Sequence, residues 1–416
     1  MAKKQQIKCS FCGRPADMSE VLVPSAIGET YICAECIDQI HDMLKEYRHE
    51  NKPKSNESDI DLTSIPKPKE INDFLNQYVI GQDDAKKYLS VAVYNHYKRL
   101  AQDKGDDVDI EKSNIIIVGP TGTGKTLLAK TIARFLDVPF TIVDATVLTQ
   151  AGYVGEDIES LLTRLLQVAD YNVEKAEKGI VFIDEIEKIA RKGDNPSITR
   201  DVSGEGVQQG LLKLLEGSIV NVPPQGGRKH PEQKMIQVNT KNILFICGGA
   251  FDGIERKIAQ RLNTHVVGYS TDAARKNIQR DNFLKYVSPQ DLKAFGLIPE
   301  IIGRLPILTN LAPLDRNDLR RILTEPNNAI IKQYKKLFDM DNVKLTFAED
   351  ALDLIVDKAI EYKLGARGLR SIVESIMIDA MYDVPSSKIK KFEVTKDYAM
   401  EKLIAANFEI ISQQNN

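Results

Sequence analysis

The chain has 416 residues, of which 42% are hydrophobic, so it is long enough for two or three domains with real cores. Its 56 Lys and Arg residues against 59 Asp and Glu residues give a net charge of −3, which argues against general electrostatic binding of nucleic acid. No apolar run reaches the roughly 18 residues that span a bilayer, and the N-terminus lacks the apolar segment of a secretory signal. We therefore expect a cytoplasmic protein that engages no membrane and no specific nucleic acid.

Four of the five cysteines form two C-x-x-C pairs, Cys9 with Cys12 and Cys33 with Cys36. This spacing is typical of a tetrahedral site in which four thiolates hold Zn²⁺. A redox pair is the alternative, but neither pair lies in the βαβ context that redox motifs require. We predict a zinc-binding domain over residues 1–50, with a helix from Ile37 to Tyr47, that needs its metal to fold. The spacing leaves open whether this domain binds partners or dimerises.

Residues 51–69 are polar, charged and proline-containing, which predicts a flexible linker before the next domain. A helix is expected from Asp83 to Leu100. The apolar, β-branched run from Ile115 to Val118 then predicts a buried strand.

Residues 119–126 match the phosphate-binding pattern G-x-x-x-x-G-K-T, between this strand and a helix that continues from Leu127. Glycines let successive backbone N–H groups turn toward phosphate oxygens, and the helix N-terminus adds partial positive charge. Lys125 is expected to reach the outer phosphates and the Thr126 hydroxyl to bind Mg²⁺. A glycine-rich turn that binds nothing is the alternative, but the flanking strand and helix argue against it.

A second apolar strand, from Gly179, ends in Asp184 and Glu185. Chemistry in a parallel sheet gathers at the carboxyl ends of its strands. We expect Asp184 to hold Mg²⁺ and Glu185 to activate the attacking water, which together predict a P-loop ATPase that uses ATP and Mg²⁺.

Further strands are expected from Pro139 to Asp144 and from Asn242 to Cys247, the second ending at Gly248 and Gly249. Two loops also contain candidate functional residues. Tyr153 and Val154 lie between glycines. The tyrosine either projects from a mobile loop or packs at a helix start, and the sequence alone does not distinguish these two arrangements. Arg228, Lys229 and His230 form a basic cluster that, taken alone, is most often a solvated turn.

Two arginines toward the C-terminus are candidates for phosphate contacts. Arg304 follows Gly303 and is either an arginine offered to a neighbour's γ-phosphate or a surface salt-bridge partner. Arg367 lies in the first turn of a predicted helix, where the helix dipole disfavours a cation, so a phosphate partner would explain it. The helical stripe expected to form the core there comprises Leu369, Ile372, Val373, Ile376, Met377, Ala380 and Met381.

In this order, these motifs resemble the ClpX family of ATP-dependent AAA+ protein unfoldases over nearly the whole chain. The resemblance implies an α/β AAA+ ATPase domain, a parallel sheet between helices, at 70–312. It also implies a helical small domain at 313–416 and a homohexameric ring that delivers unfolded or tagged proteins to the ClpP peptidase. Adaptor proteins are expected to bind the zinc domain, which dimerises in the family.

The resemblance also implies residue roles. Val79 and Ile80 are expected to contact adenine, Arg304 to act on a neighbouring subunit's ATP, and Arg367 to be a second sensor of nucleotide. Tyr153 and Val154 are expected to grip substrate in the pore, with Arg228, Lys229 and His230 at its entrance. The expected nucleotide-contacting residues are Val79, Ile80, Gly119, Pro120, Thr121, Gly122, Thr123, Gly124, Lys125, Thr126, Leu127 and Arg367.

Two features depart from the family pattern. The fourth strand ends in Cys247, Gly248 and Gly249, so no polar first sensor is assigned. The peptidase-docking tripeptide, Ile-Gly-Phe in the family, corresponds here to Val267, Gly268 and Tyr269. Two other functions remain as alternatives: a nucleic-acid motor or loader on the same ATPase core, and a zinc adaptor whose ATPase is only a switch. No peptidase motif is evident, so the chain is not expected to cleave peptides.

Overall fold

The computed structural model describes residues 8–15, 21–25, 30–40, 65–102, 108, 110–149, 156–191, 204–223, 235–264, 280–362 and 364–405. The chain divides into two compact units, Met1–Asp59 and Ile60–Asn416. In the first unit, the antiparallel strands β1 (Leu22–Pro24) and β2 (Tyr31–Cys33) lead into a helix that covers 34–40, so this helix begins before the predicted start at Ile37.

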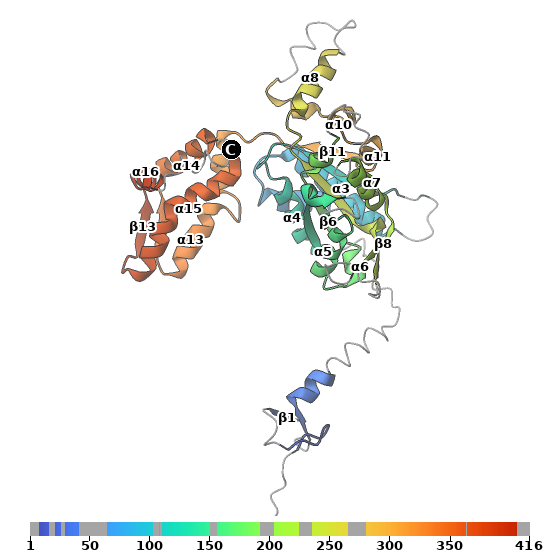
Figure 1. Ribbon diagram of the computed structural model, residues 1–416. Coiled ribbons are helices and arrows are strands. Elements are labelled where there is room, and N and C mark those ends of the chain that lie inside the picture. Colours follow the sequence, from blue (N-terminus) through green and yellow to red (C-terminus); the bar gives the residue numbers. More distant parts are fainter. Residues whose placement is uncertain are drawn as a thin grey trace, which may run out of the picture. The chain divides into compact units, whose positions relative to one another are not determined.

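The second unit is built on a five-stranded parallel sheet with the order β11-β3-β10-β7-β4 (Figure 1). Its strands consist largely of apolar and β-branched residues, which suit a sheet buried on both faces. β3 has the predicted bounds, whereas β10 begins two residues later than predicted and takes in both terminal glycines. The strands are β3 (Ile115–Val118), β4 (Phe140–Asp144), β7 (Ile180–Asp184), β10 (Leu244–Gly249) and β11 (Ile307–Asn310).

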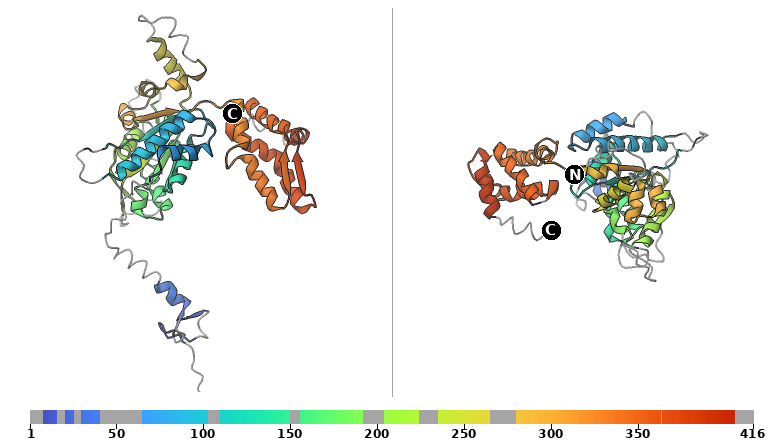
Figure 2. Two further views of the ribbon diagram at one scale, coloured as in Figure 1. Left: turned by 180° about the vertical axis from the view of Figure 1, so that it is seen from behind. Right: turned by 90° about the horizontal axis from the view of Figure 1, so that it is seen from above.

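Helices cover both faces of this sheet, because alternate residues of each strand point to opposite sides. Ile115 and Phe182 pack on one side, under α2 (Pro68–Asn76), α3 (Asp83–Leu100) and α4 (Lys125–Leu136). The two blue helices, α2 and α3, lie side by side (Figure 2), and Phe74 of α2 stacks on Phe135 of α4.

Ile116 and Ile183 pack on the other side of the sheet, against a second set of elements. These elements are α5 (Ser160–Val168), α6 (Val173–Ala176), η4 (Ile186–Ile189), α7 (Glu205–Glu216), α8 (Ile254–Thr264), η7 (Arg280–Tyr286), α10 (Pro289–Phe295) and α11 (Pro299–Gly303). The shorter elements are η3 (Ala145–Val147), η5 (Thr240–Asn242), the parallel pair β5 (Leu148–Thr149) with β6 (Glu156–Asp157), and the antiparallel pair β8 (Ile219–Val222) with β9 (Ile236–Asn239).

The C-terminal part of this unit has a core of its own, made mainly by helices. Six of the seven residues of the predicted stripe are buried there, but Met381 is 38% exposed because it lies at the edge of the stripe. The elements are α12 (Arg316–Thr324), α13 (Ile330–Met340), α14 (Glu349–Glu361), α15 (Gly365–Asp383), η8 (Val384–Ser386), α16 (Lys396–Ala405), and the parallel pair β12 (Lys344–Phe347) with β13 (Lys391–Val394).

The predicted linker reaches too far at its C-terminal end, because Pro68 and Lys69 belong to α2. Proline suits the first helical turn, where its missing N–H costs no bond. The Glu70 carboxylate also accepts from the Lys67 N–H at 2.7 Å, which fixes the start of the helix. The domain boundaries otherwise stay a prediction. Among the described residues, no helix combines the length and apolar character that crossing a membrane requires.

Candidate functional site

The phosphate-binding loop connects the carboxyl end of β3 to the start of α4, as its motif predicts. Gly122 and Gly124 have φ of 82° and 102°, a region that L side chains rarely adopt, so these turns require glycine. The Gly119 N–H donates to the Gly249 carbonyl at 3.0 Å, which fixes the loop to the neighbouring strand. The backbone geometry is therefore that of a phosphate cradle.

Lys125 is the first residue of α4, directly after the loop, and it is buried, with 8% of its surface exposed. Nζ donates to the carbonyl oxygens of Gly119 at 2.6 Å and Pro120 at 3.1 Å. Burial lowers the pKa of Lys125, and the carboxylates of Asp184 and Glu187 oppose that shift. A desolvated cation held at the mouth of a glycine loop is suited to bind phosphate oxygens.

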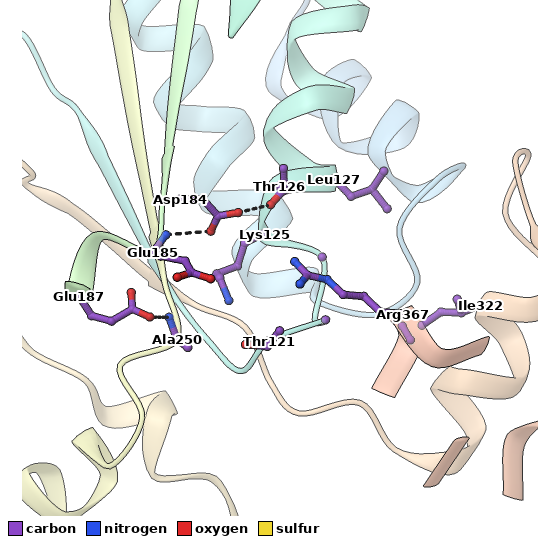
Figure 3. Close-up of a pocket in the computed structure, with 13 residues that line it drawn as sticks. Thr121, Lys125, Thr126, Leu127, Asp184, Glu185, Glu187, Ala250, Ile322 and Arg367 are labelled. Atoms are coloured by element: carbon purple, nitrogen blue, oxygen red, sulfur yellow. Dashed lines mark hydrogen bonds between the residues drawn. The ribbon is translucent and has the colours of Figure 1, made fainter. Parts of the chain in front are cut away.

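The strand β7 brings both predicted acids to the loop. The Thr126 hydroxyl donates to Asp184 Oδ2 at 2.9 Å, and the Glu185 N–H donates to Asp184 Oδ1 at 3.0 Å (Figure 3). A hydroxyl and a carboxylate in contact form the oxygen set that Mg²⁺ prefers, so the residues fit this ion. Mg²⁺ bound there would neutralise charge on the phosphates during transfer.

These groups line one cavity of about 310 Å³. Arg367 extends from α15 toward the loop, as its predicted phosphate contact requires (Figure 3). The lining residues are Thr121, Gly122, Gly124, Lys125, Thr126, Leu127, Asp184, Glu185, Glu187, Ala250, Ile322, Ala366 and Arg367.

Val79 and Ile80 line a different cavity, of about 410 Å³, together with Arg321. Arg321 adjoins Ile322 in α12, and Ile322 lines the first cavity. The expected adenine segment thus lines a second cavity, and α12 contributes to the walls of both.

Sequence reasoning missed Glu187, a third acid after the strand end. Its Oε1 accepts from the Ala250 N–H at 3.1 Å, while Oε2 is buried and has no hydrogen-bond partner among the described residues. Burial raises the pKa of Glu187. The run Asp184-Glu185-Ile186-Glu187 was the available signal.

Crowding at the end of β10 explains why glycines, and no polar sensor residue, occupy that position. A Cβ added at Gly249 would lie 2.5 Å from Glu187 Oε2 and 2.5 Å from the Phe251 ring, and at Gly248 it would lie 2.5 Å from the Phe182 ring. The end of β10 therefore has no room for a side chain.

The four paired cysteines of the first unit come together as predicted, with their sulfur atoms all within 4.8 Å of one another. Cys9 Sγ lies 4.0 Å from Cys36 Sγ, and Cys12 Sγ lies 3.7 Å from Cys33 Sγ. In a tetrahedral site with Zn–S bonds of about 2.3 Å, sulfur atoms lie about 3.8 Å apart, so the residues fit Zn²⁺. The N–H groups of Cys12, Cys33 and Phe11 favour the thiolate of Cys9 and lower its pKa to about 6.

Comparisons with known proteins agree with this reading of both units. A model of the ClpX C4-type zinc finger matches residues 7–46, one of the AAA domain (Cdc48 subfamily) matches 110–308, and one of the C-terminal, D2-small domain of ClpB protein matches 314–396. Relatives named ATP-dependent Clp protease ATP-binding subunit ClpX match almost end to end. The protein from Bacteroides thetaiotaomicron is 69% identical over 97% of each chain, and that from Bacteroides fragilis is 69% identical over 98% of each. The one from Porphyromonas gingivalis is 66% identical over 95% of this chain and 96% of its own.

The chain belongs to the ClpX family. It is an AAA+ ATPase, and it uses ATP, Mg²⁺ and Zn²⁺. The predicted family, fold class and cofactors are confirmed. The zinc-site prediction also gains support over the redox alternative, because the four cysteines form one cluster rather than two separate pairs.

Arg304 lies outside the 310 Å³ cavity of its own chain, about half exposed at the end of α11. Its Nε and Nη2 donate to Glu216 Oε1 at 3.2 and 3.0 Å. The single chain therefore shows the surface ion pair that was one of the two alternatives. An exposed pair of this kind is worth about 0–1 kcal/mol, so it holds the guanidinium only weakly.

Eight predicted functional residues lie outside the described residues. They are Tyr153 and Val154 of the expected pore loop, Arg228, Lys229 and His230 of the expected pore entrance, and Val267, Gly268 and Tyr269 of the expected docking loop. Their roles stay predictions.

Proposed function

We propose that this ClpX-family ATPase unfolds tagged protein substrates, threads them through the pore of a homohexameric ring and delivers them to ClpP. One observation carries the catalytic part of the proposal: Lys125, Thr126, Asp184, Glu185 and Arg367 line a single cavity. The curated relatives, named as ATP-binding subunits of the Clp protease, support the coupling to a peptidase.

We assign the chemistry within this cavity as follows. The loop N–H groups and Lys125 bind the β- and γ-phosphates, while Thr126 and Asp184 hold Mg²⁺. Glu185 accepts a proton from the attacking water, whose oxygen forms the new bond to the γ-phosphorus while the bond to the β-phosphate oxygen breaks. Arg367 stabilises the charge that develops on the β-phosphate oxygen of the departing ADP.

Arg304 completes the site of the next subunit in this proposal. A guanidinium aimed at the γ-phosphate stabilises charge in the transition state, and such residues contribute roughly 10³–10⁵-fold in rate. This role requires a ring, because the arginine lies outside the cavity of its own chain.

The remaining roles belong to the same proposal. Tyr153 and Val154 grip the substrate, and Arg228, Lys229 and His230 meet it at the pore entrance. Val267, Gly268 and Tyr269 dock on ClpP, the Cys₄ domain receives adaptors and some substrates, and Val79 and Ile80 contact adenine. The protein acts in the cytoplasm, where thiols stay reduced.

The test compares three additions to the purified protein with ATP: a stably folded tagged domain, an unfolded protein and single-stranded DNA. We expect both proteins to stimulate ATP hydrolysis, and the tagged domain to be degraded when ClpP from the same organism is present. Stimulation by DNA alone, with the tagged domain left folded, would replace the proposal with a nucleic-acid motor.

A further inference from the structure

Gln208, on the first turns of α7, is a buried polar side chain with no role in the ATP cavity. It is fully inaccessible to solvent, and its amide makes three hydrogen bonds. Nε2 donates to the Ile189 carbonyl at 2.7 Å and to the Gly296 carbonyl at 3.3 Å, while Oε1 accepts from the Ile298 N–H at 2.8 Å. Since a buried amide requires partners, this geometry fixes the two backbone segments relative to each other.

Each of the two segments adjoins a different residue of the proposed catalytic machinery. Ile189 ends η4, the short helix that begins directly after Glu185. Ile298 is the N-cap of α11, whose C-cap is Arg304. One amide therefore connects the segment that follows the water-activating carboxylate to the segment that presents the arginine.

A second, backbone connection lies beside the first. The Arg191 N–H donates to the Gly296 carbonyl at 3.1 Å. Gly296 has φ of 129°, and a Cβ there would lie 2.6 Å from the Arg191 carbonyl oxygen. The two segments thus approach more closely than a side chain at Gly296 would allow.

Hydrogen bonds also fix the C-terminal end of the segment 298–304, which carries Arg304 and is called the arginine segment below. Asn114, which is 1% exposed and directly precedes β3, donates from Nδ2 to the carbonyls of Arg304 at 2.9 Å and Leu215 at 3.1 Å. The guanidinium contacts Glu216, the last residue of α7. α7 therefore contacts the arginine segment at two places, at Ile298 through Gln208 and at Arg304 through Glu216, which lies about 12 Å further along the helix at 1.5 Å per residue.

We propose that Gln208 is a positioning residue for Arg304, setting where the arginine of one subunit meets the ATP of the next. The proposal rests on the proposed role of Arg304 in a neighbouring site. Without the Gln208 amide, Ile298 loses the acceptor of its N–H, and α11 shifts relative to the segment that follows Glu185. Misplacement by about 1 Å is enough to cost on the order of 10²-fold in rate.

Mixed rings separate this role from a merely structural one. A donor subunit carries Glu185→Gln with Arg304 intact, and a recipient subunit carries Arg304→Ala with Glu185 intact. Only recipients that follow a donor hydrolyse ATP in the mixture. Gln208→Met, close in size but unable to form these bonds, is then placed in the donor or in the recipient.

We expect Gln208→Met in the donor to lower kcat by about tenfold or more, with the KM for ATP unchanged. The same change in the recipient, whose own arginine is already absent, should alter kcat by less than about twofold. The matched control is Gln209→Met in the donor, because Gln209 is the exposed neighbour of Gln208. It should leave kcat unchanged.

Gln208→Glu supplies a second variant that preserves the shape of the side chain. Burial raises the pKa of a carboxyl placed there, and its neutral form can still donate to Ile189 and accept from Ile298. The loss in the donor should therefore be smaller than with Met and should shrink as the pH is lowered.

Two results with the Gln208 variants overturn the proposal: equal losses in donor and recipient, which indicate a structural role, and a loss confined to the recipient, which indicates action through the recipient's own Glu185 segment. A mixture without any Gln208 change that shows no activity above its parents refutes the trans role of Arg304, and the positioning role with it.

Discussion

Glu185 adopts φ of 54°, a left-handed conformation that is uncommon for residues other than glycine. Strain of this kind persists when the surroundings fix it, and it often marks a functional side chain. Here the Glu185 N–H donates to Asp184, and η4 begins at the next residue, so the backbone turns sharply where the sheet ends. The turn places the Glu185 carboxylate in the cavity wall.

We predict that Glu185→Gln binds ATP but hydrolyses it at least about 10²-fold more slowly, because the amide cannot accept the proton of the attacking water. Steady-state hydrolysis and equilibrium nucleotide binding measure the two effects. Lys125→Ala is the contrasting variant and should weaken nucleotide binding itself. Turnover within about twofold of the parent would remove Glu185 from the mechanism.

His96 provides a separate test of the core through pH. It is fully buried, with Nε2 lying 3.1 Å from the Asn242 carbonyl, and Nδ1 has no partner among the described residues. Burial, helped by the charges of Arg99 and Lys112, lowers the pKa of His96 to about 3. The unfolded chain therefore binds a proton near pH 6.5 that the folded chain takes up only near pH 3.

We predict that this histidine makes the ATPase part less stable as the pH falls from 6.5 toward 3, by about 1.4 kcal/mol per pH unit. Urea unfolding at pH 7.5 and 5.5 measures the change. His96→Phe lowers stability at both pH values through the lost hydrogen bond, but it should reduce the drop between them. An identical drop in parent and variant would mean that His96 is protonated in the folded chain.

At the scale of elements, sequence patterns predicted those features that depend on residues close together in the chain. The strand β3 and the loop after it depend on neighbouring residues, and the parallel sheet follows from strands that alternate with helices. The Cys₄ cluster also followed from spacing, because two pairs of thiolates at this interval have few other uses. Pro68 was misassigned because proline suits linkers and first helical turns equally well.

Contacts between distant segments were beyond prediction. Nothing near Gln208 in the sequence reveals that its amide meets Ile298, because 90 positions separate the two residues. The crowding at Gly249 likewise depends on Phe251 and Glu187 meeting in space. A single sequence carries no signal for such pairs, so these residues emerged only from the structure.

The zinc site and the ATPase core form separate compact units, which predicts that they respond separately to metal removal. Because the first unit is small and its buried core includes three of the cysteines, chelation should unfold residues 9–36. ATP hydrolysis, measured after excess Mg²⁺ is restored, should persist. Freshly purified protein should contain one zinc per chain. Protein without zinc, or equal loss of hydrolysis and zinc, would contradict this division.

At the scale of the whole molecule, the energy of ATP hydrolysis must unfold a substrate domain whose free energy of unfolding is roughly 5–15 kcal/mol. Tyr153, proposed to hold the substrate, lies in the sequence between β5 and β6. These two strands pair, with Leu148 opposite Glu156. We predict that Tyr153→Ala retains ATP hydrolysis but fails to unfold a stable tagged domain. With a fluorescent protein as the tagged domain, loss of fluorescence measures unfolding. Unfolding at the parental rate would exclude a substrate-holding role for Tyr153.

The final prediction concerns the peptidase. Val266, Val267 and Tyr269 follow α8 and precede a polar stretch from Asp272 to Asp281. Apolar residues flanked by polar ones suit a partner surface, and a valine and a tyrosine on either side of Gly268 suit a hydrophobic cleft. Compared with Ile-Gly-Phe, the valine lacks one methylene group and the tyrosine hydroxyl needs a hydrogen-bonding rim.

We therefore predict that deleting 266–270 leaves ATP hydrolysis and unfolding intact while abolishing degradation with ClpP of the same organism. Replacing Val267 and Tyr269 with Ile and Phe is the matched control. It should preserve docking and strengthen binding to a ClpP whose cleft is shaped for Ile-Gly-Phe. Degradation assays and direct binding of the two rings provide the measurements. Degradation at the parental rate after deletion would show that docking lies elsewhere, and loss of unfolding would show that the segment supports the ATPase core instead.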